Sequence, residues 1–386
     1  MTLQEAVARV LPEAIEMRRY LHSHPELSGQ EQETRDYICR KLTDWAIPHR
    51  LCTRNLGVIA DIGRGSPCIA LRVDTDALPI TEQTGLDFAS RIPGIMHACG
   101  HDVHTAVLLA AAKLLKARES ELKGTVRLLF QPAEETTGGA SDMIAEGCME
   151  NPAVTAVLGF HVDPTLAPGY AAFCYGTMNA AATDFTLTVL GRGCHGARPD
   201  QGVDAIVVSA QLITALQSLV SRSISPTASG VVTIGTIQGG TKENIIADSV
   251  TMTGTIRALN PETQSHLKDT LRRMAEHTAA AFGAEVQLKM DDLCPALIND
   301  QALTNRLLAL SRELLGEEQT VLMQEPSLGA DDFAFFSSHT PGCYFNVGAR
   351  TEGLEGQALH SPSFVPHEGC METALLLLTG GVLSLL

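Results

Sequence analysis

His97-Ala98-Cys99-Gly100-His101-Asp102-Val103-His104 runs directly into an apolar segment with helical character, residues 105–115. Three histidines, a cysteine and an aspartate therefore gather at the start of a predicted helix, 102–117. Further elements are predicted around it: helices at 3–22, 31–45 and 139–146, and apolar strands at 57–62, 68–73, 126–130 and 156–161. This alternation predicts an α/β fold with a mostly parallel sheet covered on both faces.

Four other segments carry residues that bind metals or transfer protons. They are Arg72-Val73-Asp74-Thr75-Asp76, Pro132-Ala133-Glu134-Glu135, Gly159-Phe160-His161 and Leu359-His360-Ser361-Pro362. Each lies at the end of an apolar strand or in a short loop, which is where α/β proteins build their sites. Sulfur, imidazole and carboxylate ligands suit zinc-like ions, and two ions about 3.5–4 Å apart can hold both oxygens of a hydrolysis. The pattern favours a two-metal hydrolase.

The residues allow more modest interpretations when each is taken alone. The histidines of 97–104 could cap a helix or lie at the surface, and a Glu pair could be a solvated helix start. Adjacent residues in extended backbone point to opposite sides, so one carboxylate of the Glu134-Glu135 pair could bind a metal while its neighbour faces the substrate. Asp74 and Asp76 could orient a ligating histidine or cap a turn. The combination of five segments favours the metal site.

The chain changes character after residue 176. The predicted order is a strand at 184–190, a helix at 203–222, strands at 231–238 and 249–258, a helix at 261–282 and a strand at 284–290. This β-α-β-β-α-β order is that of a ferredoxin-like unit. Helix and strand patterns resume near residue 302, so we expect a small α+β domain inserted into a larger one.

The bulk properties exclude several classes of protein. A length of 386 residues favours two domains, and 45% hydrophobic with 19% charged residues indicates a globular chain. A net charge of −16 argues against binding to nucleic acid or anionic membranes. We find no signal peptide and no apolar run near the roughly 20 residues of a membrane span. The ten cysteines are scattered, so we expect reduced thiols and a cytoplasmic protein.

With these residues laid out, the chain resembles the peptidase M20 superfamily, and more closely its amidohydrolase subfamily D. That branch includes hippurate hydrolases, indole-acetyl-amino-acid hydrolases and N-acetyl-diaminopimelate deacetylases. The resemblance runs from Arg18-Arg19-Tyr20-Leu21-His22-Ser23-His24-Pro25-Glu26-Leu27-Ser28 to His360-Ser361-Pro362-Ser363-Phe364. It implies two divalent metal ions per subunit (Mn²⁺ or Zn²⁺, with Co²⁺ or Ni²⁺ as alternatives), bound by Cys99, His101, Glu135, His161 and His360.

The resemblance also assigns roles beyond metal binding. Glu134 matches the general base, and we place Asp76 in the catalytic group as the residue that orients a ligand. The inserted domain resembles a lid and dimerisation domain, which divides the chain into 1–177 and 292–386 for catalysis and 178–291 for the lid. His195 matches a histidine that stabilises the oxyanion in the partner subunit of a homodimer. Asn244 and Arg257 match residues that hold the substrate carboxylate.

Two positions depart from the family pattern: Cys194 stands where Ala or Gly is usual, and Asp200 follows Pro199 where many relatives have His. The predicted activity is a metal-dependent amidohydrolase that cleaves a small-molecule N-acyl amino acid. A dipeptidase or aminopeptidase and a non-catalytic metal-binding relative are the alternatives. An intact Glu134 argues against a non-catalytic metal-binding protein. The lack of an extra acidic group to bind an α-amine argues against an aminopeptidase. The acyl group, the metal and the bridging ligand stay open.

Overall fold

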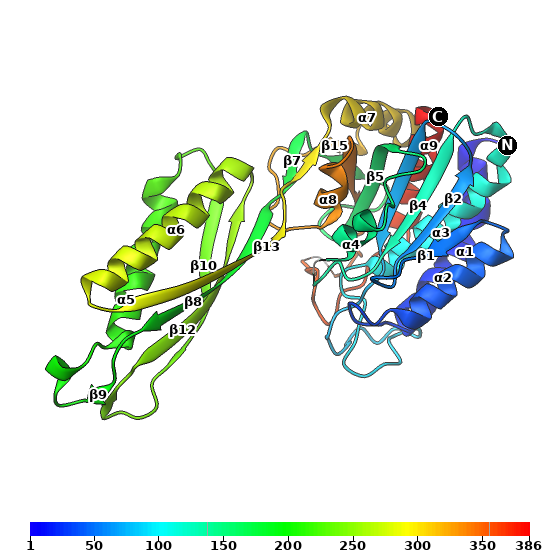
Figure 1. Ribbon diagram of the computed structural model, residues 1–386. Helices are drawn as coiled ribbons and strands as arrows, with labels where there is room; N and C mark the ends of the chain where they lie inside the picture. Colours follow the sequence, from blue (N-terminus) through cyan, green and yellow to red (C-terminus); the bar gives the residue numbers. More distant parts are fainter. Residues whose placement is uncertain (137, 355) are drawn as a thin grey trace. The chain divides into compact units, whose positions relative to one another are not determined.

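The computed structural model describes residues 1–136, 138–354 and 356–386. The chain forms two compact units (Figure 1). The first contains Met1–Gly176, Ile298–Glu325 and Asp331–Leu386, and the second contains Thr177–Leu297 and Pro326–Ala330. The second unit is thus longer than the expected 178–291, because its last strand continues further and a later segment returns to it. In that segment the Ser327 N–H donates to the Met178 carbonyl at 2.8 Å.

Among the described residues of the first unit, eight strands form one mixed sheet. In sheet order they are β1 (His49–Leu51), β2 (Val58–Gly63), β4 (Thr125–Gln131), β3 (Cys68–Asp74), β5 (Val154–Asp163), β16 (Gly342–Gly348), β6 (Ala171–Phe173) and β15 (Thr320–Leu322). The central pairs β4–β3, β3–β5 and β5–β16 are parallel, whereas β1–β2, β2–β4 and β16–β6 are antiparallel. The expected α/β sheet is confirmed, with antiparallel strands towards its edges.

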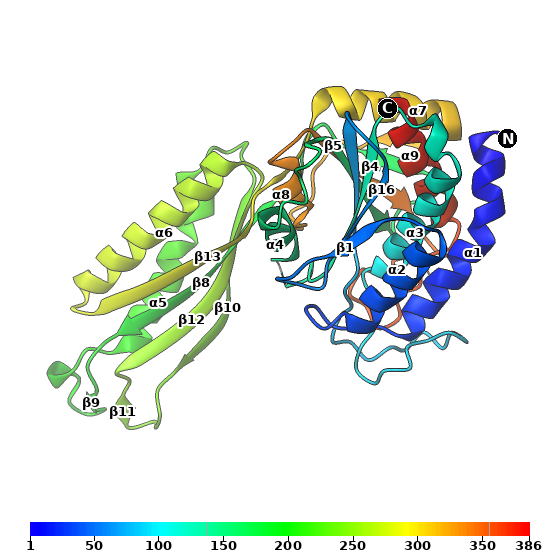
Figure 2. The same ribbon diagram turned by 45° about the vertical axis from the view of Figure 1, so that its right-hand side comes forward.

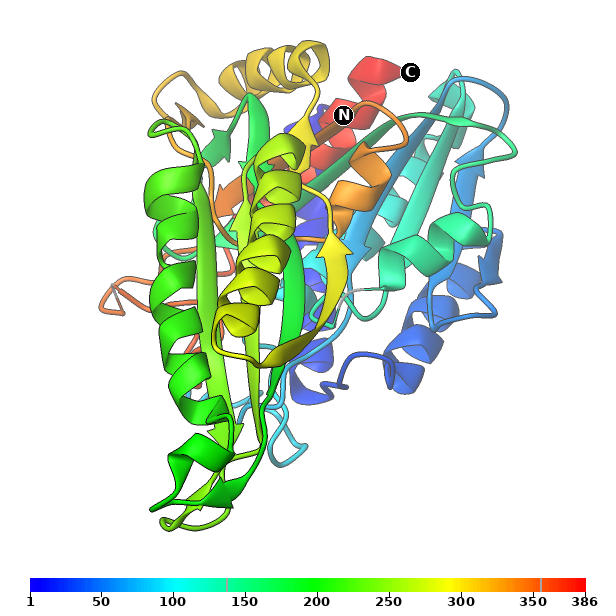
Figure 3. The same cartoon turned by 60° about the vertical axis from the view of Figure 1, so that its left-hand side comes forward.

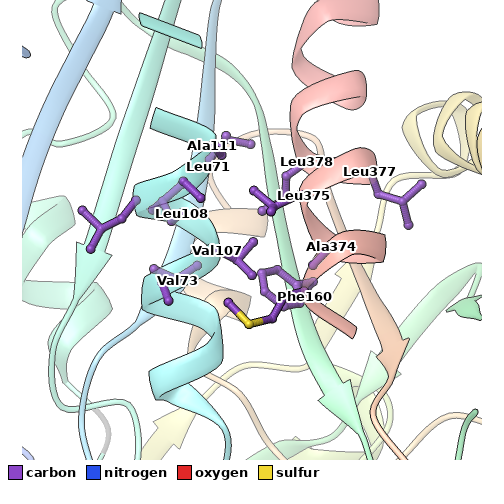
Figure 4. Packing of buried hydrophobic residues seen from close by; sticks show 14 of the residues in the cluster. Leu71, Val73, Val107, Leu108, Ala111, Phe160, Ala374, Leu375, Leu377 and Leu378 are labelled. Atoms are coloured by element: carbon purple, nitrogen blue, oxygen red, sulfur yellow. The ribbon is translucent and has the colours of Figure 1, made fainter. Parts of the chain in front are cut away.

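Helices cover both faces of this sheet. They are α1 (Leu3–Ser23), α2 (Gln32–Asp44), α3 (His101–Ala117), α4 (Gly139–Ala145), α7 (Gln301–Leu315), α8 (Phe333–Ser337) and α9 (Cys370–Leu385), with a 3₁₀ turn at Glu119–Glu121. Figures 1 and 2 show α1, α3 and α9 on one face and α4 and α8 on the other. In Figure 4, Val73, Val107, Phe160 and Ala374 meet from β3, α3, β5 and α9. All four side chains are buried, so α3 is fixed against the strands that precede the site residues.

The second unit has an antiparallel sheet in the order β10-β12-β8-β13. Its elements are β8 (Ala181–Leu190), α5 (Ala205–Leu216), β10 (Gly230–Gly239), β12 (Ser249–Ala258), α6 (Pro261–Ala281) and β13 (Glu285–Cys294). Figure 3 shows α5 and α6 side by side on one face of the sheet. Alternation explains this arrangement, because Phe185, Leu187 and Val189 of β8 are buried beneath the helices. The order matches the predicted ferredoxin-like unit.

Several short elements complete the structure. Strands β9 (Cys194–His195) and β11 (Ile245–Ile246) form a two-stranded ribbon, and β7 (Gly176–Asn179) pairs with β14 (Leu297–Asn299). A 3₁₀ turn covers Pro199–Gln201. The helix predicted at 203–222 is wrong at its end: α5 stops at Leu216 and a π turn follows at Leu219–Ser223. By length and composition alone, Ala205–Ser223 is apolar enough to cross a membrane; Val208 and Leu212 pack in the core of the second unit.

Candidate metal centre

Two groups of possible metal ligands meet in the first unit and have one residue in common. Cys99, His101 and His161 form one group, and Cys99, Glu135 and His360 form the other. Within each group the ligand atoms lie within 4.8 Å of one another. All five ligands expected from the sequence are therefore together, and Cys99 belongs to both groups.

Gly100 makes the close spacing of Cys99 and His101 possible. Its φ is +90°, a left-handed conformation that favours glycine, and it precedes the first residue of α3. A Cβ atom here would lie 2.4 Å from Cγ2 of Val162, the residue after His161. The absence of a side chain lets the start of α3 approach the end of β5, which brings two ligand-bearing segments together.

Hydrogen bonds at Nδ1 leave Nε2 of two histidines available as ligand atoms. His101 Nδ1 lies 3.0 Å from the carbonyl oxygen of Asp76 and 3.1 Å from its Oδ1. His161 Nδ1 lies 2.8 Å from the carbonyl oxygen of Val162. Because these partners are acceptors, Nδ1 donates in each ring, and Nε2 is the nitrogen that would bind a metal.

Asp76 makes contacts with two of the candidate ligand residues, His101 and Glu135. Besides contacting His101, its Oδ2 accepts the Ser28 hydroxyl at 2.7 Å and the Glu135 N–H at 3.0 Å. The side chain is fully buried, and although burial opposes ionisation, the hydrogen bond to His101 lowers the pKa of Asp76. The structure thus places Asp76 where it orients two ligands, His101 and Glu135.

His104, the last histidine of the quoted motif, is held on both ring nitrogens. Its Nδ1 lies 2.6 Å from Oδ1 of Asp74, and its Nε2 accepts the Val162 N–H at 3.2 Å. Burial lowers the pKa of His104 to about 4, so the ring is neutral at pH 7. The contacts with Asp74 and with the Val162 N–H hold the backbone next to His161, so His104 supports the position of that ligand. His104 is therefore neither a helix cap nor a surface histidine, because its ring is buried.

Glu134 and Glu135 follow a tight turn after β4. The preceding Ala133 has a φ of +55°, in the left-handed region. Glu134 has a ligand atom within 4.8 Å of those of His101 and Glu135, and also of those of Asp331 and Asp332. Burial, followed by the charges of Asp331 and Asp332, raises the pKa of Glu134 well above its ordinary value. A raised carboxyl pKa suits a group that accepts and returns a proton near neutral pH.

A buried polar network behind Glu134 was not found by the sequence analysis. The guanidinium of Arg72 donates to Asp332 at 2.6 Å and to Asp74 at 3.0 Å, and it lies 3.2 Å from Asp331. Gln131 donates to both oxygens of Asp332, at 2.8 and 2.7 Å. An arginine within an otherwise apolar strand and an adjacent Asp pair were the available signals. Their pairing spans 260 residues, which no local pattern records.

The side chains of the two ligand groups are chemically suited to bind divalent cations. His101 Nε2 is buried and has no hydrogen-bond partner among the described residues. Burial also holds the pKa of the Cys99 thiol well above its usual range. A cation would compensate a buried thiolate and use the free imidazole lone pair, as thiolate and imidazole ligands do at zinc-like sites.

The expected lid residues lie in the second unit, and two of them share its small ribbon. The Gly196 N–H donates to the Asn244 carbonyl at 2.8 Å, next to the pairing of His195 with Ile245. His195 Nδ1 accepts the Ala197 N–H at 3.0 Å, so its exposed Nε2 carries the proton. Arg257 lies on β12, half-buried.

The model of peptidase family M20/M25/M40 matches residues 70–379. The chain belongs to this family. It is 41% identical over 357 residues to an N-acetyl-L-cysteine deacetylase of Bacillus subtilis, covering 92% of this chain and 83% of the relative. It is 38% identical over 358 residues to an IAA-amino acid hydrolase (ILR1-like 4) of Arabidopsis thaliana, covering 91% of this chain and 81% of the relative.

A solved structure gives the same fold. The YXEP protein of Bacillus subtilis, described as a dinuclear metal binding peptidase from the M20 family, has a TM-score of 0.85 and 34% identity. The match covers 98% of this chain and 99% of that one. The resemblance predicted from the sequence is confirmed: this M20 chain is a hydrolase, and its ligand groups lie in a fold that binds two metals in YXEP.

Proposed function

We propose that this M20 hydrolase cleaves the amide bond of N-acyl amino acids, releasing a carboxylate and a free amino acid. The observation that carries the proposal is the position of Glu134. Its carboxylate lies within 4.8 Å of the ligand atoms of His101 and Glu135, yet it belongs to neither of the groups that contain Cys99. A protein that only binds metal has no need for a half-buried carboxylate with a raised pKa at that place, whereas a hydrolase needs a base there.

Two divalent cations would be held by the two ligand groups, with Cys99 shared between them. Sulfur and imidazole favour zinc or cobalt, and the carboxylate also suits manganese, with nickel as another candidate. When bound, such a pair supplies a water of lowered pKa and positive charge beside the reacting carbonyl oxygen.

The chain's own residues supply the proton transfers. Glu134 takes a proton from the attacking water and returns it to the amide nitrogen as the carbon–nitrogen bond breaks, so the amine leaves neutral. The charges of Asp331 and Asp332 favour the protonated form of Glu134 and stabilise it between the two transfers. Asp76 keeps His101 and Glu135 in place during both steps.

The second unit would complete the site within a homodimer. The exposed Nε2–H of His195 is a donor suited to the oxyanion that forms on the carbonyl. The planar guanidinium of Arg257 and the side-chain amide of Asn244 would hold the substrate's α-carboxylate. His195 resembles a family histidine that acts on the partner subunit's site, and we infer the same arrangement for His195 here.

The names of the relatives support this substrate class. One acts on N-acetyl-L-cysteine and another on IAA–amino acid conjugates. Both substrates join an acyl group to an amino acid through an amide bond. An N-acyl amino acid also presents the free carboxylate that Arg257 and Asn244 are proposed to bind.

The test measures amine release from acetyl-, benzoyl- and indole-acetyl-amino acids, and from dipeptides, by metal-reconstituted protein. Glu134→Gln should lower kcat by about 10²–10⁴-fold, because it removes the proton acceptor while it keeps the size of the side chain. Metal content, measured in parallel, should stay at the wild-type value. Turnover of dipeptides alone would establish the peptidase alternative, and no turnover by folded, dimetallated protein would overturn the proposal.

A further inference from the structure

The turn that presents Glu134 and Glu135 starts from an unfavourable backbone conformation. Ala133 has a φ of +55°, and a non-glycine residue adopts this left-handed conformation only where surrounding contacts hold it. The direction of the two following side chains depends on that conformation. A contact that stabilises Ala133 therefore controls both the base and a ligand.

The Ala133 N–H donates to Oε1 of Glu31 at 2.8 Å. Glu31 lies 102 residues earlier in the chain, directly before α2, and is only 1% exposed. Although it precedes α2, its side chain makes no capping hydrogen bond to this helix. Glu26 instead accepts the N–H groups of Glu33 and Thr34, at 3.0 and 2.8 Å. The buried carboxylate of Glu31 is thus directed to the turn.

The turn is anchored at two successive points. Glu31 holds the N–H of Ala133, and Asp76 holds the N–H of Glu135 at 3.0 Å. Glu134 lies between these anchors. Burial, with a smaller effect of the Asp76 charge, raises the pKa of Glu31 to about 7. A carboxyl group kept in such an unfavourable environment is typical of a functional site.

We propose that Glu31 is a positioning residue that holds Ala133 in its left-handed conformation and thereby directs Glu134 and Glu135 into the metal centre. The inference rests on the proposed function for the role of Glu134, whereas its effect on Glu135 concerns metal affinity alone. The essential property is the reach of the acceptor oxygen, and two substitutions separate reach from charge. Glu31→Asp keeps the charge and withdraws the oxygen by one methylene, whereas Glu31→Gln keeps an acceptor at full reach.

The experiment measures kcat and KM of the metal-loaded enzyme and, separately, the affinity of the metal-free protein for Mn²⁺. Glu31→Asp should lower kcat by about 10- to 100-fold with little change in KM, because a small displacement of a base has effects of this size. It should also weaken Mn²⁺ binding, since Glu135 moves with the turn. Glu31→Gln should keep most of both properties.

A second substitution makes the test specific. Ala133→Gly removes the cost of a positive φ, so combined with Glu31→Asp it should recover at least half of the lost kcat on a logarithmic scale. The matched control is Ala46→Gly, because Ala46 also has a positive φ, +51°, and is exposed after the other end of α2. Combined with Glu31→Asp, Ala46→Gly should relieve similar backbone strain but should not restore the kcat that Glu31→Asp loses.

The proposal is overturned if Glu31→Gln loses as much as Glu31→Asp, if Ala133→Gly restores nothing, or if Ala46→Gly restores as much. Its failure is distinguishable from failure of the proposed function. Wild-type protein that hydrolyses no N-acyl amino acid would overturn the function, and the Mn²⁺ affinities of the same variants would then decide on Glu31 alone.

Discussion

Glu82 shows how single buried carboxylates stabilise the long connection between β3 and α3. Its side chain is 5% exposed, lies 3.2 Å from His22 Nε2 and accepts the Ser90 N–H at 2.6 Å. His22 in turn lies 2.9 Å from Asp102, the residue after His101. Although burial opposes ionisation, the hydrogen bonds from His22, Thr84 and Ser90 lower the pKa of Glu82 to about 2.

This shift predicts an acid-dependent stability. A carboxylate whose folded pKa lies below its unfolded value of about 4.5 stabilises fully above pH 4.5 and loses that contribution as the pH falls towards 2. Glu82→Gln should therefore reduce the free energy of unfolding at pH 7 by about 3 kcal/mol. At pH 3.5 the difference from wild type should shrink by about 1 kcal/mol. Urea unfolding of wild type and Glu82→Gln at both pH values measures the difference in the free energy of unfolding. A difference that grows on acidification would contradict the lowered pKa of Glu82.

The sequence could predict residues whose chemistry is unusual for their position. Cys99, His101, Glu135, His161 and His360 stand out as metal-binding types at strand ends, and the structure gathers them. It could not reveal Glu31 or Asp332, because each acts through a partner far away in the chain and has no local signature. Metal ligands can be recognised from their type, whereas supporting residues are defined by their contacts.

At the scale of elements, the junction of α3 with β5 depends on Gly100. Gly100→Ala places a methyl group 2.4 Å from Val162 Cγ2 in addition to straining the positive φ. The strain costs about 1–2 kcal/mol and the overpacking about 1–3 kcal/mol. We expect lower thermal stability and weaker Mn²⁺ binding, because Cys99 and His101 flank the altered residue.

Gly29 provides the matched control for this substitution. It also has a positive φ, +76°, but a Cβ atom there meets nothing within 4 Å. Gly29→Ala should therefore show only the cost of strain. Val162→Ala, combined with Gly100→Ala, should recover part of the stability. Equal losses in the two alanine variants would show that the close approach to Val162 is unimportant.

Element types were easier to predict than element ends. The helix expected at 203–222 overruns because apolar residues continue past Leu216, and Leu219 stays in the core through a π turn instead. Strands of two or three residues, such as β9 and β11, are too short for a period of two to appear. Such strands depend on pairing with distant segments.

For the whole molecule, the apolar surface of the second unit bears on its assembly. On α5, Ile206 and Val207 are 47% and 49% exposed, and on β10, an edge strand of the sheet, Ile237 is 52% exposed. An exposed apolar helix beside an unpaired strand edge is a surface that soluble proteins usually cover. Because the inserted domain resembles a dimerisation domain, we propose a second copy of this chain as the partner.

Light scattering of the purified protein should give the mass of a dimer, and the double variant with Ile206→Asp and Val207→Asp should give the mass of a monomer.

Complementation of two inactive variants then tests whether one subunit of the dimer contributes residues to the active site of the other. His195→Ala and Glu134→Gln homodimers should each be nearly inactive. If His195 acts on the partner's site, mixed dimers have one complete site, and random exchange at equal concentrations should restore about a quarter of wild-type activity. If His195 serves its own subunit, every site lacks one group and mixing restores nothing. Recovered activity in the mixture, together with no activity in the monomeric Ile206→Asp, Val207→Asp variant, would therefore establish that catalysis depends on the dimer.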